Sequence, residues 1–360
     1  MSVSQRETRN RRLSHFWRSL ACASLLFAAL LSGARADTET RFFRIGTAAT
    51  GGSFFEIGAV VASAISSPVE GAACVGGGEC GVPGLVAVAE ATQGSVENLH
   101  LVNSGQIESG FAQADLAVLA YGGAGTDEAP MRRLRAIASL FPEALHIVVR
   151  VDSPIRSVAD LAGKTVAVGD LGSGTAANSR VLLAAAGLGE SDVVRRNIRP
   201  AQAMEEIKAG TVDALILAGS YPVPAIQELA AATPVRLVPV NGMVAAQLEE
   251  AYPLYSATAI PAGTYRNVDT DTQTVGFYAL WIVRDDADEA LVHDITRAAW
   301  SDSAAQLYAG LDPVGRQIKL ANALRGLSLP LHPGAARFYR EQGLSLEGLP
   351  SASPDEVPAR

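Results

Sequence analysis

The sequence has few residues of the kinds that build catalytic and metal sites. Its 360 residues include five histidines, and no two of them have the HExxH spacing or another metal-ligand spacing. Ser173 lies in a glycine turn, but there is no Gly-x-Ser-x-Gly elbow around it and no His or Lys can be assigned as its base. We therefore predict no catalytic residue, no metal and no cofactor, and we predict that the protein is not an enzyme. A hydrolase that acts through Ser173 is the enzymatic alternative.

The motifs of nucleotide-binding loops are also missing. The segment LAGKT, residues 161–165, ends like a P-loop, but the upstream glycine that the motif requires would fall at Val158. Its Lys-Thr pair leads into a predicted strand, whereas a P-loop leads into a helix. Gly46 and Gly51 do not have the dinucleotide-binding spacing either. These departures argue against a nucleotide site.

Long apolar runs are absent except near the N-terminus. Residues 1–36 contain several Arg, then the apolar run 20–31, and then Ala34-Arg35-Ala36. This order is typical of a secretory signal peptide, and the run is shorter than the roughly 20 residues of a membrane-spanning helix. We predict cleavage after Ala36 and a soluble periplasmic protein.

Basic residues are too few to favour nucleic acid or an anionic lipid surface as a partner. Removing the six Arg and one Glu of residues 1–36 from the 29 basic and 37 acidic residues leaves 23 and 36, a net charge of −13. Such a charge argues against nucleic acid or anionic lipid as a partner. Apolar residues make up 48% of the chain and charged residues 18%, which indicates a folded protein with a large core.

Cysteine is scarce, and its positions predict one disulfide. Cys22 lies in the predicted signal peptide, whereas Cys74 and Cys80 lie in the glycine-rich segment CVGGGEC. Export to an oxidising compartment favours a bond between these two. A metal or redox pair is the weaker alternative, because the spacing is not CxxC and no His lies nearby. The Pro/Ser-rich residues 346–360 predict a flexible tail.

Apolar runs alternate with helical patterns along the rest of the chain. Strand-like runs such as 42–45 and 214–217 are each followed by a glycine-containing loop and a helical pattern. This alternation is typical of parallel sheets covered on both faces, and its restart after residue 150 predicts two α/β lobes. The runs 146–151 and 276–284 are candidates for the connections between the lobes.

Three details of local structure follow from turn and capping signals. Residues 134–150 are predicted to form two strands around a turn at Pro142. Ser95 is predicted to cap a helix over 94–105. A further helix is predicted over 314–326.

Three glycine-containing loops repeat one design, each between a strand and a helix. They are Gly51-Gly52-Ser53, Gly172-Ser173-Gly174-Thr175 and Gly219-Ser220. In open α/β sheets, ligands bind beyond the carboxyl ends of the strands. Backbone N–H groups, hydroxyls and a helix N-terminus together suit a carboxylate. Turns that only cap helices are the alternative, but three such loops across two lobes favour a ligand site.

Other polar residues have both a functional and a structural interpretation. Gln113 and Asp115 lie where the strand of GFAQADLAVLAY meets its helix, so they could reach the same crevice, or Asp115 could be the helix N-cap. His146 lies in a predicted buried strand and His100 on a predicted helix. For these two histidines we favour structural roles.

A series of sequence blocks occurs in a recognisable order. The blocks are IGTAATGGSFFEIG, ATQGSVENLHLVNSGQIESGFAQADLAVLAY, LRAIASLFPEALHIVVRVDSPIRSVADLAGKTVAVGDLGSGT, GTVDALILAGSYPVPAI, YPLYSATAIPAGTY and LHPGAARFY. The first is similar to the GTxxTGGxYYPxG block of the TAXI family, and the others continue that family's order across residues 41–343. TAXI proteins are the solute-binding subunits of one branch of the TRAP (tripartite ATP-independent periplasmic) transporters.

The resemblance implies a type II periplasmic-binding-protein fold with two lobes, a hinge and an interlobe cleft. Residues 37–144 with 276–345 would form one lobe, and residues 145–275 the other. The implied ligand is a small anionic solute, an organic acid or amino acid similar to glutamate or 2-oxoglutarate. The implied partners are the membrane permease subunits of a TRAP transporter, which an ion gradient drives. We expect a monomer.

The resemblance also implies the residues that bind the ligand. They are Thr50, Gly51, Gly52, Ser53, Phe54, Ser95, Asn98, Gln113, Asp115, Ser173, Gly174, Thr175, Gly219, Ser220 and Pro222. Phe54-Phe55 departs from the family's usual tyrosines, and Ser220-Tyr221 lengthens the usual Gly-x-Pro turn. The alternatives are a ligand-sensing subunit of a signalling receptor and the binding protein of an ATP-driven importer.

Overall fold

The computed structural model describes residues 40–68, 74, 80–123, 129–252, 254–311 and 313–352. The chain from Thr40 onward forms one compact unit. The predicted signal peptide, residues 1–36, and the end of the predicted tail, residues 353–360, lie outside the described residues. Within the described ranges, no helix has both the length and the apolar character needed to span a bilayer.

The described residues contain ten strands that join in one mixed sheet. The strands are β1 (Arg41–Gly46), β2 (Leu85–Glu90), β3 (Ser109–Gln113), β4 (Leu134–Arg150), β5 (Thr165–Ala167), β6 (Val194–Arg196), β7 (Ala214–Gly219), β8 (Val235–Leu237), β9 (Ser256–Ile260) and β10 (Thr272–Arg284). Their order is β2-β1-β3-β10-β4-β7-β5-β6, with β8 beside β4 and β9 beside β10. The strands β1, β2 and β3 are parallel, as are β5, β6 and β7. The long strands β4 and β10 run antiparallel to their neighbours.

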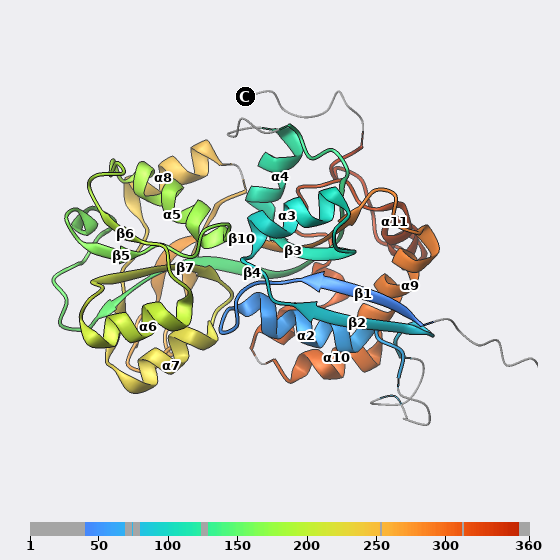
Figure 1. Cartoon of the computed structure of the whole chain (residues 1–360), viewed down its shortest axis with the longest axis horizontal. Coiled ribbons are helices and arrows are strands. Elements are labelled where there is room, and N and C mark those ends of the chain that lie inside the picture. The colour runs from blue at the N-terminus through green and yellow to red at the C-terminus, as the bar shows by residue number, and fades with distance from the viewer. Residues whose placement is uncertain are drawn as a thin grey trace, which may run out of the picture. The chain divides into compact units, whose positions relative to one another are not determined.

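The helices pack around two parts of the sheet and so form two lobes (Figure 1). The first lobe contains β1–β3 with α2 (Ser53–Ile65), α3 (Ser95–Ser104), α4 (Ala114–Gly122), α9 (Glu289–Ala299), α10 (Asp302–Ala309) and α11 (Pro333–Glu341). The second lobe contains β5–β8 with α5 (Gly174–Ala185), α6 (Pro200–Ala209), α7 (Pro224–Ala232) and α8 (Gly242–Ala251). The strands β4 and β10 extend through both lobes. The predicted α/β fold with two lobes is confirmed.

Strand β4 corrects the predicted pair of strands over residues 134–150. It is one continuous strand of 17 residues. Pro142 is tolerated because the ladder with β7 begins only at Ala144, so at Pro142 a strand pairs with β4 on one side only. Proline has no backbone N–H to donate, and on a side without a neighbouring strand no ladder hydrogen bond is lost. The predicted helix over 314–326 is also wrong, since two short 3₁₀ turns, Val314–Gln317 and Leu320–Asn322, occupy this segment.

Near-continuous apolar runs arise because helices cover both faces of the sheet. In the second lobe, Ala144 and Val148 of β4 pack into one core cluster, whereas Leu145, Ile147 and Val149 pack into the cluster on the other face. Successive side chains of a strand point to opposite faces, so both sets are buried. The runs over 146–151 and 276–284, predicted as connections between the lobes, lie largely in β4 and β10.

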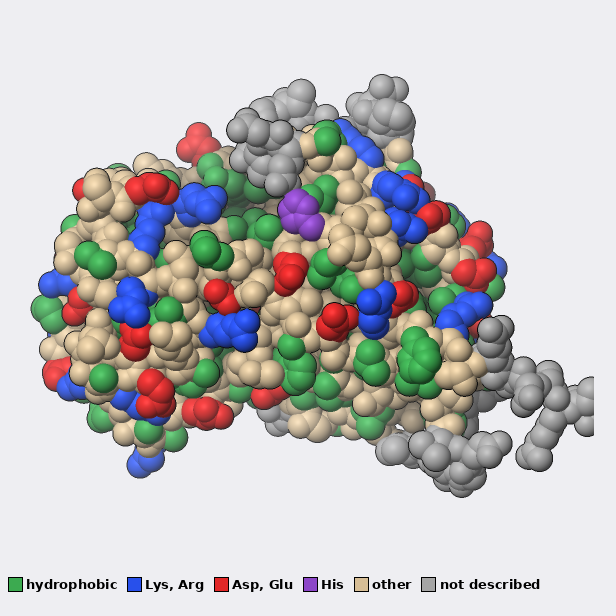
Figure 2. All heavy atoms as spheres, viewed as in Figure 1, with side chains coloured by type: hydrophobic (Ala, Val, Ile, Leu, Met, Phe, Trp, Pro, Cys, Tyr) green, Lys and Arg blue, Asp and Glu red, His purple; other side chains and the backbone are tan. Residues whose placement is uncertain are grey.

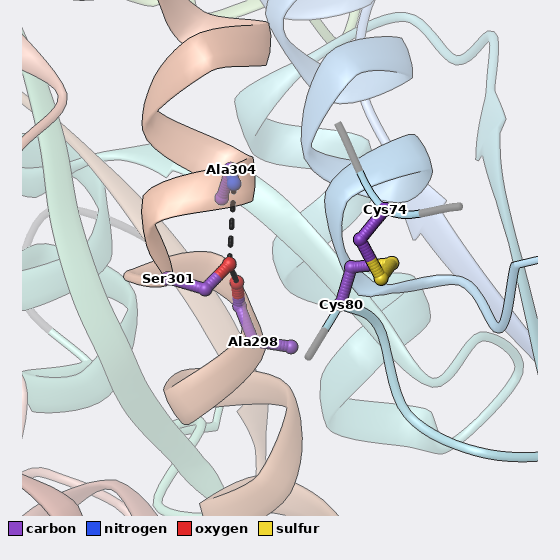
Figure 3. The surroundings of a disulfide bond; sticks show 5 residues. All are labelled: Cys74, Cys80, Ala298, Ser301 and Ala304. Atoms are coloured by element: carbon purple, nitrogen blue, oxygen red, sulfur yellow. Dashed lines mark hydrogen bonds between the residues drawn. A yellow bond between two sulfur atoms is a disulfide. The ribbon is translucent and has the colours of Figure 1, made fainter. Parts of the chain in front are cut away.

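The predicted disulfide between Cys74 and Cys80 is present. Figure 3 shows it beside the turn between α9 and α10, and Cys80, Ala298 and Ser301 line a common surface hollow there. Ser301 caps α10 by accepting a hydrogen bond from the Ala304 N–H at 3.1 Å, and its hydroxyl donates to the Ala298 carbonyl at 2.8 Å.

Charged side chains of both signs are interspersed on the face shown in Figure 2. Among the described residues, exposed ion pairs include Arg150 with Asp152 at 3.0 Å and Arg133 with Asp285 at 3.1 Å. Exposed pairs of this kind contribute little to stability, about 0–1 kcal/mol each. The fold therefore depends on the apolar clusters rather than on surface charge.

Candidate functional site

A small cavity lies between the two lobes, at the carboxyl ends of parallel strands from both. Its volume is about 70 Å³. It is lined by Ala48, Ala49, Gly52, Ser53, Phe54, Gln93, Gly94, Ser95, Gln113, Glu143, Gly169, Asp170, Ser173, Gly174, Thr175, Ile198, Pro200 and Leu215–Ala218. Segments that follow β1, β2 and β3 in one lobe, and β5 and β6 in the other, converge there. This is where open α/β sheets place ligands.

Eight of the predicted ligand-binding residues line this cavity. They are Gly52, Ser53, Phe54, Ser95, Gln113, Ser173, Gly174 and Thr175. Two of the three glycine loops thus meet across the cleft, although more than 100 residues separate them in the chain. The helices α2 and α5 begin at these loops, with Gly52 and Ser173 as their N-cap residues.

Ser173 and Thr175, in the loop of the second lobe, each accept a hydrogen bond from a backbone N–H through the side-chain hydroxyl. Ser173 Oγ accepts a hydrogen bond from the Ala176 N–H at 3.0 Å and caps α5. Thr175 Oγ1 accepts from the Ala218 N–H at 3.2 Å and ties α5 to β7. Since a hydroxyl can donate while it accepts, each can give its proton to a ligand oxygen.

The third glycine loop lies beside the cavity rather than in its lining. Ser220 is 2% exposed, and its hydroxyl donates to Ser53 Oγ at 2.7 Å. Gly51 accepts a hydrogen bond from the Ala225 N–H at 3.3 Å. These bonds join the two lobes. Gly51, Gly219 and Ser220 therefore belong to an interlobe contact, and the exposed Thr50 and half-buried Pro222 are outside the lining as well.

Asn98 was predicted to face the ligand, but the structure gives it a different role. Its side chain is fully buried, and its Nδ2 donates to the carbonyls of Thr47 at 2.7 Å and Phe111 at 2.8 Å. Thr92 donates to its Oδ1 at 2.8 Å. Every polar atom of the amide is thereby paired. Asn98 connects α3 to the sheet and contributes no free group to the cavity.

Asp115 neither lines the cavity nor caps its helix, so both predicted roles are corrected. Gln113 is the N-cap residue of α4, and Asp115 lies in the first turn of the helix. Its Oδ2 accepts a hydrogen bond from Asn178 Nδ2 of α5 at 2.8 Å, across the two lobes. Asn178 also donates to the Tyr255 hydroxyl at 2.6 Å. Burial raises the pKa of Asp115 to about 6, and the hydrogen bonds from Tyr255 and Asn178 limit the rise.

The predicted cap at Ser95 is also wrong, because the N-cap residue of α3 is Gly94. Gly94 has a φ of 122°, which other residues rarely adopt, and a Cβ there would lie 3.6 Å from Ser173 Cα of the opposite lobe. Ser95 Oγ instead accepts a hydrogen bond from the Gln113 N–H at 3.2 Å. The loop after β2 is thereby held to the end of β3, where both line the cavity.

The lobes are closed over the cavity in this structure. The Glu97 N–H donates to the Gly172 carbonyl of the other lobe at 3.2 Å. A Cβ on Gly174 would lie 2.1 Å from Gln113 Oε1 and 2.8 Å from Ser95 Oγ. A larger residue at this position would force these side chains of the opposite lobe to move.

Glu143 is a lining residue that the sequence analysis did not identify. It lies in β4, is 2% exposed, and its Oε2 has no hydrogen-bond partner. The pKa of its carboxyl is raised to about 8, mainly by burial and also by the charge of Asp115, while a hydrogen bond from Gln113 opposes the rise. The signal that could have identified it is a Glu inside an otherwise near-continuous apolar run, LFPEALHIVV.

The histidines of interest are outside the cavity lining. His146 is fully buried in β4, where its Nδ1 lies 3.0 Å from the Ala144 carbonyl and its Nε2 lies 2.9 Å from the Tyr265 hydroxyl. Burial lowers its pKa to about 4. His100 is exposed on α3. Within the part of the chain that the structure describes, no three His, Cys, Asp or Glu side chains gather in a way that could hold a metal ion.

The two lobes and the cavity between them are the architecture of the type II periplasmic-binding-protein fold. The chain belongs to the NMT1-like family, whose family model matches residues 45–343.

Several solved structures are similar to this chain. The alkanesulfonate-binding protein SsuA from Xanthomonas axonopodis pv. citri, bound to MOPS, is 18% identical, with 84% of each chain covered and a TM-score of 0.45. The periplasmic aliphatic sulphonate binding protein SsuA from Escherichia coli is 17% identical, with 84% of this chain and 88% of that chain covered and a TM-score of 0.41. An ancestral arginine-binding protein bound to arginine is 16% identical, with 77% and 96% covered and a TM-score of 0.41. At these TM-scores the similarities carry no argument about the ligand of this chain.

Proposed function

We propose that this protein is a periplasmic solute-binding protein that captures a small organic acid or amino acid in the interlobe cavity. It would deliver this solute to the membrane permease subunits of an ion-gradient-driven TRAP transporter, as a member of the TAXI branch. The observation that carries the proposal is the convergence of the loops 51–53 and 172–175, from opposite lobes, around one cavity. The order of the sequence blocks supports the TAXI assignment, and the N-terminal pattern supports export with cleavage after Ala36.

The proposed mechanism is capture by closure. Helices α2 and α5 begin at the cavity, and helix N-termini attract a carboxylate through their free N–H groups and positive potential. The hydroxyl protons of Ser173 and Thr175 add two donors. A ligand that touches both lobes favours the closed form, which the permease would recognise.

An enzyme is the less favoured alternative. Ser173, the candidate nucleophile, already accepts the capping hydrogen bond of α5, and no His, Lys or Arg is found among the described residues that line the cavity. A sensor subunit and the binding protein of an ATP-driven importer would share the same site. A neighbouring gene for a large multi-span permease would favour TRAP transport, and one for a sensor kinase would favour signalling.

A thermal-shift screen over small acids and amino acids tests the proposed function. A ligand present at 100 times its Kd adds about 2.7 kcal/mol to the free energy of unfolding, which a shift in melting temperature reports. The double variant Ser173→Ala, Thr175→Ala is expected to weaken binding by about tenfold or more, the effect of losing two donors.

The matched control is Ser301→Ala, which removes the same kind of helix cap on α10, away from the cavity. It should lower stability and leave affinity unchanged. If calorimetry shows that Ser173→Ala, Thr175→Ala binds the ligand as tightly as the wild type does, these two hydroxyls do not bind the ligand.

A further inference from the structure

A second and larger cavity lies between the two lobes. Its volume is about 600 Å³. One wall consists of side chains of α3 and α4 with Met131 of the first lobe, and the other of side chains of α5 with Leu171 of the second lobe. In Figure 2, green side chains gather in the hollow between the lobes. We call this cavity the interlobe groove, and its volume is within the range of about 300–1,000 Å³ that small-molecule sites have.

The interlobe groove is separate from the cavity of about 70 Å³, although Ser173 lines both. At their boundary the two lobes touch. The Glu97 N–H donates to the Gly172 carbonyl at 3.2 Å, and a Cβ on Gly94 would lie 3.6 Å from Ser173 Cα. Because each lobe supplies one wall, the groove is complete only when the lobes are closed.

The walls of the groove are mostly apolar. Leu99 of α3 and Leu116 and Leu119 of α4 line one wall, and Leu171 and Val181 line the other. Leu171 is 69% exposed, although burial of a leucine side chain is favourable. A ligand with an apolar body would cover these side chains.

The charged side chains of the groove favour an anion. Among the described lining residues they are Arg180, Arg195 and Glu190. Glu190 pairs with Arg195 at 3.0 Å, whereas Arg180, exposed on α5, forms no ion pair with another described residue. The groove therefore carries a positive charge on a protein whose net charge is −8. Arginine binds a carboxylate through paired, charge-assisted hydrogen bonds.

We propose that the interlobe groove is a second ligand site, which binds an amphipathic monocarboxylate. The carboxylate of this ligand pairs with Arg180, and its apolar body lies between α4 and α5. The ligand binds the closed form, because both lobes contact it. This site goes beyond the proposed function, since the solute of that function occupies the smaller cavity.

Titration calorimetry of the whole mature protein with four probes tests the inference. Octanoate has both the charge and the chain, octan-1-ol lacks the charge, octylammonium reverses it, and acetate lacks the chain. We expect octanoate to bind about tenfold or more tightly than each of the other three, because each lacks either the charged hydrogen bonds or the buried chain.

The variant Arg180→Glu tests the charge of the groove. It should weaken octanoate binding about tenfold or more and raise the affinity for octylammonium. Arg340→Glu, at an exposed position in the last turn of α11, is the matched control and should behave like the wild type. Thermal unfolding of each variant establishes that it is folded.

Two further variants test whether both lobes contribute. Leu119→Gln in one wall and Leu171→Gln in the other should each weaken octanoate binding about threefold or more, because each removes apolar surface from the groove. Met243→Gln, at a position on α8 that is 82% exposed, is the matched control and should leave the affinity unchanged. An unchanged affinity in Leu119→Gln or in Leu171→Gln overturns the proposal that both lobes form the site.

A last variant separates this inference from the proposed function. Thr175 lines the smaller cavity and is not among the residues that line the groove, so Thr175→Ala should leave octanoate binding unchanged. If Thr175→Ala weakens octanoate binding and Arg180→Glu does not, octanoate occupies the smaller cavity, and the inference fails while the proposed function stands. Octanoate that does not bind, or that binds no more tightly than octan-1-ol or octylammonium, also overturns the inference. If octanoate binds as expected but the acid screen finds no ligand for the smaller cavity, the proposed function fails and the inference stands.

Discussion

Asp115 and Glu143 are both buried carboxyls near the cleft, yet their surroundings differ. Asp115 on α4 accepts hydrogen bonds from Asn178 and Tyr255 and joins the two lobes. Each carboxyl has one buried oxygen without a hydrogen-bond partner, but of the two residues only Glu143, on β4, lines the cavity. Burial raises the pKa of each, to about 6 and about 8. A raised pKa alone therefore does not show which of the two acids lines the cavity, and only their positions in the fold do.

The largest expected effect tests the structural side of this comparison. Asp115→Ala removes the acceptor for Asn178 Nδ2 and leaves that buried donor and the Tyr255 hydroxyl without this partner. We expect the free energy of unfolding to fall by about 2–3 kcal/mol. Urea denaturation measures it. If the free energy of unfolding falls by less than about 0.5 kcal/mol, the hydrogen bond between Asp115 and Asn178 does not stabilise the fold.

The next effect concerns the contact between the lobes. Gly174→Ala places a Cβ 2.1 Å from Gln113 Oε1 and 2.8 Å from Ser95 Oγ, so both side chains must move away from their positions in the closed cleft. Affinity for the ligand found in the screen should fall about tenfold, or about 1.4 kcal/mol, with little change in stability. Gly189→Ala, whose Cβ would meet only Asp192 Oδ2 at 3.3 Å, is the control. Small-angle scattering with and without ligand should show loss of closure in the first variant only.

The last effect is a change in the pH dependence of stability at Glu143. Its pKa is raised above that of an unfolded glutamate, so between about pH 4.5 and pH 8 the folded state holds a proton that the unfolded state has lost. Stability therefore falls as the pH rises through this window, and Glu143→Gln removes that slope. From pH 6 to pH 8, the variant should gain about 1.4 kcal/mol or more over the wild type. Asp115 titrates in both proteins, so its contribution cancels.

If the free energies of unfolding of the wild type and of Glu143→Gln change equally between pH 6 and pH 8, the assigned ionisation of Glu143 is contradicted. The same measurement on Asp115→Asn provides the contrast. That variant should change the pH dependence mainly below about pH 6, where the carboxyl of Asp115 titrates.

Much of the fold could be predicted from local patterns. Helix α2 follows the loop of Gly51 and Gly52, and Gly105 ends α3 with a φ of 76°, as glycine at a helix end commonly does. The apolar runs of β4 and β10 indicated buried strands. The continuity of β4 through Pro142 could not be predicted, because it depends on which neighbouring strand pairs at that point.

The candidate site was only partly predictable for the same reason. The loops 51–53 and 172–175 carry a local signature of strand, glycine turn and helix start, so they were recognised. Asn98 was assigned to the ligand by its position in the resemblance, and the sequence does not show whether its amide faces a cavity or a backbone carbonyl. Glu143 was missed because a single Glu in an apolar run does not show what lies opposite it.

Sequence by itself determined the local features of this protein: the alternation of strands and helices, the glycine turns at two helix starts, and the disulfide between Cys74 and Cys80. These depend on residues close together in the chain, whose conformational preferences act over a few bonds. Tertiary structure alone decided which turns meet across the cleft, and that Glu143, Gln113 and Gln93 line one cavity, each with a buried oxygen that has no hydrogen-bond partner. Such a cavity exists only once the strands β4 and β10 have brought distant segments together, because burial and charge compensation depend on three-dimensional neighbours.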